Sequence, residues 1–266
     1  MNPSRVFAVV LRQFYLYRSS PQRILPIFLF VAIDILLWGF LTRYLNGLSH
    51  VNYFVPALLG AVLLWDFLTR AMQGITTAFF EDVWSRNFLN VFATPIRTSE
   101  YLSGLVIIGV INTVISLVVM FVMAWALFGL SFLAYGWALG PFLAVLFLTG
   151  VALGILGTAM VLRLGPASEW LVWPIPTLLL PFAGAYYPIS SLPGWMQAVS
   201  KALPPSYVFE GMRAVVAGRP APWGELAIAT GLACVYLLAA CLVFAATYRF
   251  AIRTGLIARY SAETVS

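Results

Sequence analysis

Charged residues are scarce in this sequence, and that scarcity is its first constraint. Charged side chains make up 9% of the 266 residues and apolar side chains 62%, whereas a soluble domain carries about 25% charged residues. So low a charged fraction excludes a soluble core and indicates a polytopic membrane protein. Apolar runs occupy most of the chain and leave no stretch long enough for a separate soluble domain.

Lysine, histidine and cysteine are nearly absent, which excludes several kinds of site. The one lysine, Lys201, precedes an alanine, so the Gly-Lys-Ser/Thr sequence of a phosphate-binding P-loop is missing. His50 is the one histidine, and the two cysteines stand seven residues apart, not as a Cys-x-x-Cys pair. We therefore expect no metal, no cofactor and no catalytic residue in this chain.

Six apolar runs are long enough to cross a bilayer, which takes about 20 residues of helix. Basic residues gather before the first run and after the last, so the positive-inside rule predicts that both ends of the chain are cytoplasmic. The predicted fold is an all-α polytopic membrane protein, a single transmembrane domain over residues 1–266. Its six predicted spans cover residues 24–43, 53–73, 101–128, 137–162, 170–187 and 224–248.

Three further segments are predicted to be helical without crossing the membrane. Residues 4–18 place apolar side chains at helical spacing, which predicts an amphipathic helix in the membrane interface. Residues 80–93 predict a short helix on the inner side, with Glu81 and Asp82 in its first turn. Residues 188–218 hold two helices of about 16–20 Å each, too short to cross, so we expect a re-entrant outer hairpin.

Two carboxylates fall inside predicted spans, Asp34 and Asp66. Such residues are costly in a membrane unless they are paired or hydrated. Asp66 can pair with Arg70 one turn later, whereas Asp34 has no partner in its own helix. Three interpretations stay open: a substrate-facing cavity lined by the first two spans, a packing hydrogen bond between helices, or a paired-aspartate intramembrane hydrolase.

The order of these parts resembles a known family. Two stretches carry the resemblance, EDVWSRNFLNVFATPIRTSEYLSG (81–104) and YYPISSLPGWMQAVSKALPPSYVFEGMR (186–213). Both are similar to segments of the membrane subunit of type-2 ATP-binding-cassette (ABC) exporters, which include nodulation-factor, polysaccharide and drug exporters. The resemblance covers essentially the whole chain, although the proline between the last two short helices is doubled here, as Pro204 and Pro205.

The resemblance implies a partner that hydrolyses ATP. Two permeases, expected to be a homodimer, would work with two separately encoded ABC-type ATPase subunits, which would bind ATP and Mg²⁺, in the inner membrane of a bacterium. The segment 80–93 would be the coupling helix that enters a groove of the ATPase, and 4–18 would be the elbow helix beside it. The implied ATPase-coupling residues are Glu81, Asp82, Trp84, Arg86 and Phe88.

The resemblance also implies where a substrate passes. The path would run between two permeases along the first, second and fifth spans, and the outer hairpin would close it. The expected path-lining residues are Asp34, Trp38, Tyr53, Phe54, Asp66, Phe182, Tyr186 and Tyr187. The expected gate residues are Pro188, Leu192, Pro193, Trp195, Pro204, Pro205, Tyr207, Glu210 and Arg213.

The expected function is thus the permease of an ATP-driven exporter for an amphipathic, lipid-linked or glycan-type substrate. An intramembrane hydrolase that uses Asp34 and Asp66, or a stand-alone channel or scaffold, is the alternative. Within the hairpin, Glu210 and Arg213 stand three residues apart on one helix and are expected to pair. Simple pairing predicts that exchanging their charges harms the protein less than removing either one.

Overall fold

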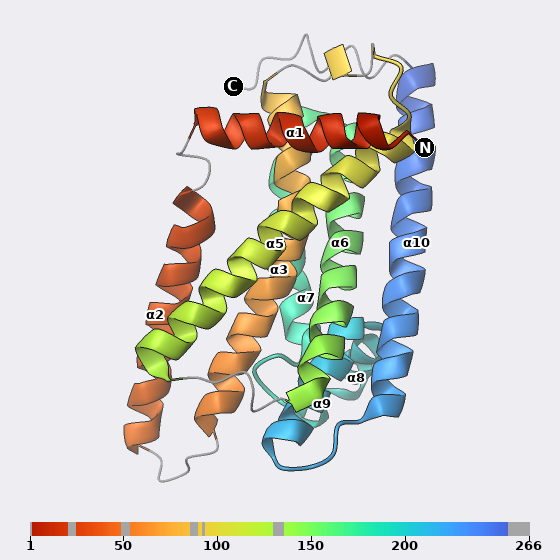
Figure 1. Cartoon of the computed structure of the whole chain (residues 1–266). Helices are drawn as coiled ribbons and strands as arrows, with labels where there is room; N and C mark the ends of the chain where they lie inside the picture. Colours follow the sequence, from red (N-terminus) through yellow and green to blue (C-terminus); the bar gives the residue numbers. More distant parts are fainter. Residues whose placement is uncertain are drawn as a thin grey trace.

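The computed structural model describes residues 2–20, 25–48, 54–85, 90–91, 94–129 and 136–254, and all regular structure within these ranges is helical (Figure 1). Four helices in them are long and apolar enough to cross a membrane, over Leu58–Trp84, Thr98–Phe128, Gly136–Leu164 and Trp223–Arg253. The helices concerned are α3 (Phe54–Trp84), α5 (Thr98–Phe128), α6 (Leu139–Leu164) and α10 (Trp223–Arg253). Another long helix, α2, covers Leu25–Leu48.

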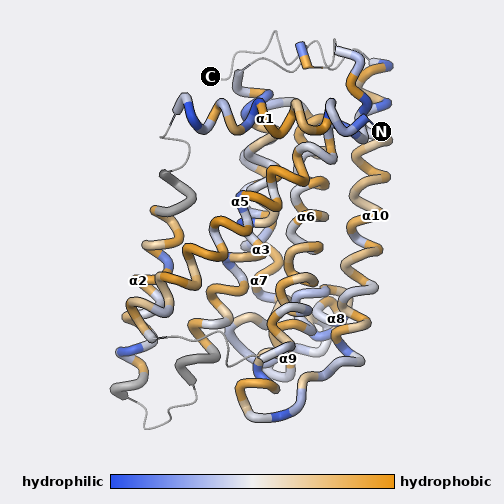
Figure 2. The backbone as a smooth tube through the Cα atoms, viewed as in Figure 1, coloured by the Kyte–Doolittle hydropathy of each residue, from blue (hydrophilic) through white to orange (hydrophobic). Residues whose placement is uncertain are grey.

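Helix α1 (Pro3–Ser19) lies across one end of the bundle, at a steep angle to the long helices (Figure 1). The side chain of Asn2 caps it by accepting a hydrogen bond from the Ser4 backbone N–H at 3.0 Å. The last turns of α10 lie at this same end (Figure 1). Hydrophobic residues run along α5, α6 and α10, whereas α1 carries both hydrophilic and hydrophobic residues (Figure 2).

The second predicted span is longer than expected, because α3 continues from Phe54 to Trp84. Nothing between residue 73 and Trp84 stops it, since the segment holds a single glycine, Gly74, and no proline. The separate helix predicted over 80–93 is therefore corrected: its first five residues are the end of α3. Residues 86–89 and 92–93 lie outside the described part of the chain.

The fifth predicted span, 170–187, is not one helix. The chain forms the 3-10 helix η3 (Pro166–Leu171), then a turn, then α7 over Ile175–Ala183. Gly184 ends α7 with a φ of 63°, a conformation that favours glycine. At 1.5 Å per residue, α7 is about 14 Å long and spans less than half of a hydrocarbon core of about 30 Å. The apolar composition of this segment predicted one continuous helix. It contains three prolines that disfavour one, Pro174, Pro176 and Pro181.

Two short helices follow where the sequence predicts a hairpin. After the 3-10 turn η4 (Ile189–Ser191) come α8 (Gly194–Ala202) and α9 (Pro204–Val216). Pro204 and Pro205 occupy the first positions of α9, where a missing N–H costs nothing. Both helices lie at the end of the bundle opposite α1 (Figure 1).

Helix α6 packs tightly against α3 because glycines allow close approach. A Cβ added at Gly150 would lie 2.6 Å from the Leu68 carbonyl oxygen, and one at Gly154 would lie 2.9 Å from that of Met72. The backbones of α3 and α6 are thus nearly in contact, as in small-residue packing of membrane helices.

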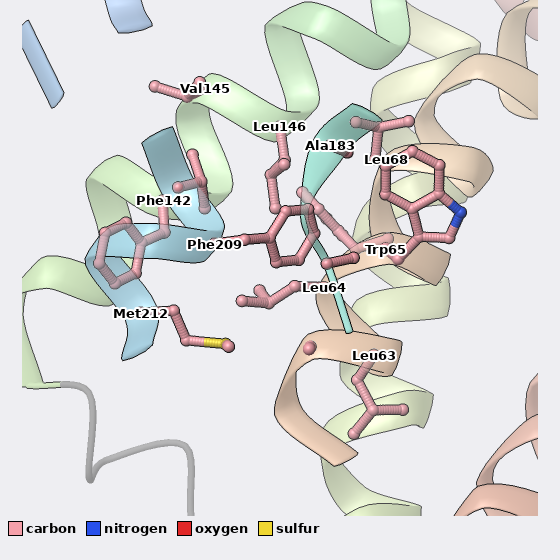
Figure 3. Close-up of a cluster of buried hydrophobic side chains, with 14 of the residues drawn as sticks. Leu63, Leu64, Trp65, Leu68, Phe142, Val145, Leu146, Ala183, Phe209 and Met212 are labelled. Carbon is pink, nitrogen blue, oxygen red and sulfur yellow. The ribbon is translucent and has the colours of Figure 1, made fainter. Parts of the chain in front are cut away.

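A buried apolar cluster joins α9 and α7 to these two helices (Figure 3). The ring of Phe209 on α9 packs against Trp65 on α3 with centroids 6.0 Å apart. Phe142, Leu146 and Met212 surround it, and all three are buried. The short helices are therefore anchored in the bundle and do not lie loosely on its surface.

Candidate functional site

A cavity of about 600 Å³ opens among α1, α2, α3 and α5. This volume falls within the range of about 300–1,000 Å³ that is typical of sites for small molecules. Apolar atoms make up most of its wall, but several polar side chains also line it. The polar residues of the wall include Asp34, Asp66, Arg70, Gln73, Asn112 and Ser116.

An ion triad occupies one side of this cavity. Arg70 contacts the two oxygens of Asp66, with its Nε and Nη2 atoms each 3.2 Å from one of them. The same Nη2 atom lies 3.8 Å from a carboxylate oxygen of Asp34 on α2. The pair within α3 confirms the spacing argument, while the partner of Asp34 comes from a neighbouring helix. Asp66 is nearly buried, whereas the Asp34 side chain is 43% exposed.

Two tryptophans, Trp84 and Trp173, line the part of the cavity nearer α1, and Glu169 accepts a hydrogen bond from each of them. The indole N–H of Trp84 donates to one Glu169 oxygen at 2.7 Å, and that of Trp173 donates to the other at 3.4 Å. Phe80 lies between them, with centroids 5.9 Å from Trp84 and 6.0 Å from Trp173. Glu169 belongs to η3, so the break after α6 is what brings this carboxylate to the end of α3.

Glu81 and Asp82 are buried in the last turns of α3 and bind α1. Asp82 forms an ion pair with Arg12 and accepts a 2.7 Å hydrogen bond from the Tyr101 hydroxyl. Glu81 accepts a hydrogen bond from the side chain of Gln13. The expectation that these two acids lie in the first turn of a separate helix is corrected: they lie in the last turns of α3, where α1 and α5 contact them. Their coupling role stays a prediction.

Glu100 makes a second connection between α1 and α5. Its carboxylate accepts the backbone N–H groups of Asn2 at 2.7 Å and of Arg97 at 3.0 Å. The guanidinium of Arg5 lies 3.5 Å away. Helix α1 is thereby fixed along its length, at Asn2, Arg12 and Gln13, to the ends of the two long helices beneath it.

The other predicted coupling residues have different placements. Trp84 is 46% exposed and keeps part of its ring at the surface of the bundle end. Arg86 and Phe88 lie outside the described residues, so their contact with a partner stays a prediction.

The predicted path residues do not form one group. Asp34 and Asp66 line the cavity, but Trp38, Phe182, Tyr186 and Tyr187 are not part of its wall. Trp38 packs on Tyr186 with centroids 5.4 Å apart, and the Tyr187 hydroxyl donates to the Pro181 carbonyl at 2.8 Å. Tyr53 lies outside the described residues, as does the side chain of Phe54.

The predicted gate pair, Glu210 and Arg213, is formed at 2.9 Å and does more than neutralise charge. Arg213 also donates to the carbonyls of Gly184 at 2.7 Å and Ala185 at 3.3 Å. Glu210 accepts the backbone N–H of Ile189 at 2.7 Å. The pair therefore fixes the turn after α7 onto α9.

The remaining gate residues shape the hairpin backbone or pack within it. Pro188 precedes η4, Leu192 follows it, and Pro193 precedes α8. The Trp195 ring packs on Phe182 at 6.0 Å, and the Tyr207 hydroxyl donates to the Lys201 carbonyl at 2.7 Å.

Sequence reasoning missed two serines in this hairpin. Ser200 donates to the Phe182 carbonyl and Ser206 to the Ser200 carbonyl, each at 2.6 Å. Both are buried, but a lone serine carries no signal of such a role in the sequence.

The sequence also missed most of the cavity wall. Thr69, Gln73 and Thr77 lie on the same face of α3 as Asp66 and Arg70, a polar stripe that helical spacing could have revealed. Asn112 donates a 2.8 Å hydrogen bond to the Tyr17 hydroxyl, and this pair joins residues 95 positions apart. Nothing local predicts that contact, nor the meeting of Glu169 with Trp84.

Comparison with known proteins complements this geometry. A search of curated proteins finds none that matches the chain. The family model of the ABC-2 type transporter matches residues 4–217, from α1 through α9. That match covers most of the chain, and the apolar helices agree with a multi-pass membrane protein. The chain therefore belongs to the ABC-2 type transporter family and is a membrane permease of an ABC transporter.

Proposed function

We propose that this permease is the membrane-spanning half of an ATP-driven exporter and that the cavity beside α3 belongs to its substrate path. The observation that carries the proposal is an ion triad inside an otherwise apolar bundle, where Asp34, Arg70 and Asp66 lie on one side of about 600 Å³ of space. Intramembrane ionisable groups mark substrate pathways because their cost must be offset by a function. The substrate class expected for the path is amphipathic, lipid-linked or glycan-type.

Family membership implies an ABC ATPase partner, and we propose that two copies of it bind ATP and Mg²⁺ for two copies of this chain. The contact would lie at the end of α3 and in the segment after it, through Trp84, Arg86 and Phe88. Trp84 suits this role because its ring is part exposed and part of the cavity wall. A displacement of the end of α3 by the ATPase would therefore also move Trp84 in the cavity wall.

The end of the bundle that carries α1 would face the cytoplasm of a bacterium, with the inner membrane around the long helices. Arg5, Arg12 and Arg18 on α1 support this orientation, as do Arg249 and Arg253 in the last turns of α10. Helix α1 and the last turns of α10 lie at one end of the molecule (Figure 1), and the positive-inside rule assigns the end that is rich in basic residues to the cytoplasm. The α8–α9 hairpin would then lie outside and close the path there.

The arrangement favours transport over the hydrolase alternative. A pair of catalytic aspartates works by sharing a proton between neighbouring carboxylates. Here the Arg70 guanidinium contacts both Asp66 and Asp34, so each carboxylate forms an ion pair with a basic side chain. A stand-alone channel or scaffold would need no coupling segment. Co-purification of an ATPase with the permease would therefore argue against this alternative, and its absence would favour it.

The test is co-purification of the ATPase with the Trp84→Asp variant. A charge at this position removes an apolar contact, so the ATPase should no longer co-purify while the permease elutes as the wild type does. Trp137→Asp is the matched control, because Trp137 is 93% exposed just before α6, at the opposite end. If Trp84→Asp elutes abnormally, Phe88→Asp replaces it. Wild-type amounts of ATPase with a well-folded variant would contradict the coupling role.

A further inference from the structure

Glu169 connects the end of α3 to the segment that leads into α7. One of its carboxylate oxygens accepts the indole N–H of Trp84, the last residue of α3, at 2.7 Å. The other oxygen accepts the indole N–H of Trp173, which lies in its own segment, at 3.4 Å. The bond to Trp84 is the shorter one, and its charged acceptor makes it stronger than a hydrogen bond between neutral groups. Glu169 thus holds the residue that is proposed to meet the ATPase.

Consecutive hydrogen-bonded turns continue from Glu169 to α7. The Glu169 carbonyl accepts the Val172 N–H at 2.9 Å, and the Val172 carbonyl accepts the N–H of Ile175, the first residue of α7, at 3.1 Å. Val172 is fully buried and packs over Gly157 of α6, where an added Cβ would lie 2.7 Å from its side chain. The segment between Glu169 and α7 is therefore an ordered part of the bundle, and a displacement of Glu169 would move α7 with it.

The far end of α7 is hydrogen-bonded to both helices of the α8–α9 hairpin. The Phe182 carbonyl accepts the hydroxyl of Ser200, on α8, at 2.6 Å. The Gly184 carbonyl, just after α7, accepts the guanidinium of Arg213, on α9, at 2.7 Å. Hydrogen bonds constrain direction as well as distance, so the hairpin is expected to follow α7 when α7 moves.

Helix α3 also contacts this hairpin directly, but through apolar packing. The ring centroids of Trp65 on α3 and Phe209 on α9 lie 6.0 Å apart. Hydrophobic contact is non-directional, and packed helices can slide past each other by small amounts. The hydrogen bonds at the two ends of the α7 segment resist such sliding, so this segment is the firmer connection between the α3 end and the hairpin.

We propose that Glu169 is a positioning residue of the transport cycle, which passes a displacement of the α3 end through α7 to the α8–α9 hairpin. The inference rests on the proposed function, because it connects the proposed ATPase contact with the proposed closure of the path. Coupling between distant sites is carried by packed side chains, hydrogen bonds and rigid elements. Loss of the hydrogen bond between Trp84 and Glu169 should therefore separate the motion of the hairpin from the action of the ATPase.

The test measures motion of the hairpin in the complex of the permease with the ATPase that co-purifies. Spin labels are attached at Ala198→Cys on α8 and Gly140→Cys near the start of α6, two exposed positions, after Cys234 and Cys241 are replaced by alanine. Labelled chains are co-expressed with an excess of cysteine-free chains, so that the distance is measured within one copy. Double electron–electron resonance compares the nucleotide-free complex with the complex trapped by ATP and vanadate. Trapping should shift the wild-type distance by on the order of 1–5 Å, the scale of helix movements in such transitions.

Two variants remove the hydrogen bond from opposite sides. Glu169→Ala removes the acceptor, and Trp84→Phe removes the donor but keeps an aromatic ring. In the Glu169→Ala complex the nucleotide-free distance should stay at its wild-type value and the ATPase should still trap vanadate, while most of the shift is lost. Trp84→Phe should lose the shift to the same extent in the complexes that form, and the double variant should lose no more than either single one, because both break one contact. Glu169→Gln keeps one acceptor oxygen and should keep more of the shift than Glu169→Ala.

Trp173→Phe is the matched control, because it removes the other hydrogen bond to the same carboxylate, one that does not reach α3. It should keep the wild-type shift. A full shift in a folded Glu169→Ala or Trp84→Phe variant, an equal loss in Trp173→Phe, or no shift in the wild type would each overturn the inference.

The outcomes separate this inference from the proposed function. An ATPase that co-purifies with a permease whose hairpin moves independently of Glu169 would overturn the positioning role and leave the exporter assignment intact. If no ATPase co-purifies with the wild-type permease, the proposed function is overturned, and the inference that rests on it is overturned as well.

Discussion

The hydroxyl of Tyr101, in the first turn of α5, donates a 2.7 Å hydrogen bond to the carboxylate of Asp82, in the last turn of α3. Arg12 of α1 pairs with the same carboxylate. One buried acid therefore joins three helices at the end of the bundle where the ATPase is proposed to act. Removing a donor to a buried charge costs more than removing a donor to a neutral acceptor, because the charge loses solvation that nothing replaces.

Tyr101→Phe should therefore destabilise the permease by about 1.5–3 kcal/mol. The measurement is the free energy of unfolding from a denaturant titration in detergent micelles. Tyr236→Phe is the matched control, because the Tyr236 hydroxyl donates to the neutral Ala202 carbonyl at 2.7 Å, and its loss should cost about 0.5–1.5 kcal/mol. Equal losses in the two variants would show that Asp82 does not depend on Tyr101.

The two aspartates of the triad should respond differently to neutralisation. Asp66→Asn removes the close, buried partner of Arg70 and should cost about 3 kcal/mol of stability. Asp34→Asn removes a longer contact at a more exposed site and should cost about 1 kcal/mol or less. The same denaturant titration checks both, and a larger loss for Asp34→Asn would mean that the contact at 3.8 Å is the dominant one.

The gate pair should not tolerate an exchange of charges, contrary to what simple pairing predicts. With arginine at position 210, nothing accepts the Ile189 N–H, and with glutamate at position 213 nothing donates to the Gly184 carbonyl. We expect the double exchange Glu210→Arg with Arg213→Glu to lower the thermal midpoint at least as much as Glu210→Ala or Arg213→Ala does. A midpoint restored toward the wild-type value would show that charge neutralisation is the main role of the pair.

Close packing of α3 and α6 should make Gly150 intolerant of even one methyl group. A Cβ there would lie 2.6 Å from the Leu68 carbonyl oxygen, which belongs to the backbone and cannot turn aside. Gly150→Ala should cost about 1–3 kcal/mol through overpacking.

Gly140→Ala serves as the control for that substitution, because it lies on the same helix and an added Cβ meets nothing within 4 Å. The thermal midpoint of Gly140→Ala should stay level or rise slightly, since alanine favours helix more than glycine does. A similar fall in both variants would show that backbone freedom, and not packing, is what position 150 requires.

Local spacing explains why parts of the site could be predicted. Asp66 and Arg70 are four residues apart and Glu210 and Arg213 three apart, so any helix through them brings the side chains together. The prolines at 204 and 205 likewise mark the start of a helix wherever they occur, because their ring fixes φ and removes an N–H. The resemblance to ABC permeases rested on such local features, and the family match over residues 4–217 confirms the family.

Continuity of helices was less predictable. Apolar composition is the same in an unbroken span and in one interrupted by a turn, so the run over 170–187 looked continuous although α7 covers only Ile175–Ala183. The reverse error occurred at the end of α3. Charged residues at 81 and 82 suggested a new helix, but an amphipathic helix can continue when a neighbour covers its acids, and α1 does so.

The sequence by itself determined that this chain is a membrane protein of long apolar helices, since hydrophobic length and proline positions act on each segment separately. The resemblance of two motifs, at 81–104 and 186–213, indicated the ABC permease family. Only the tertiary structure decided which charges meet. Asp34 on α2 forms an ion pair with Arg70 on α3. Asp82 contacts Arg12 and Tyr101, and Glu169 accepts a hydrogen bond from Trp84. These contacts depend on the distances and angles at which the helices pack. Residues that are distant along the chain determine this packing together, because they bury one another. No local sequence pattern therefore encodes these contacts.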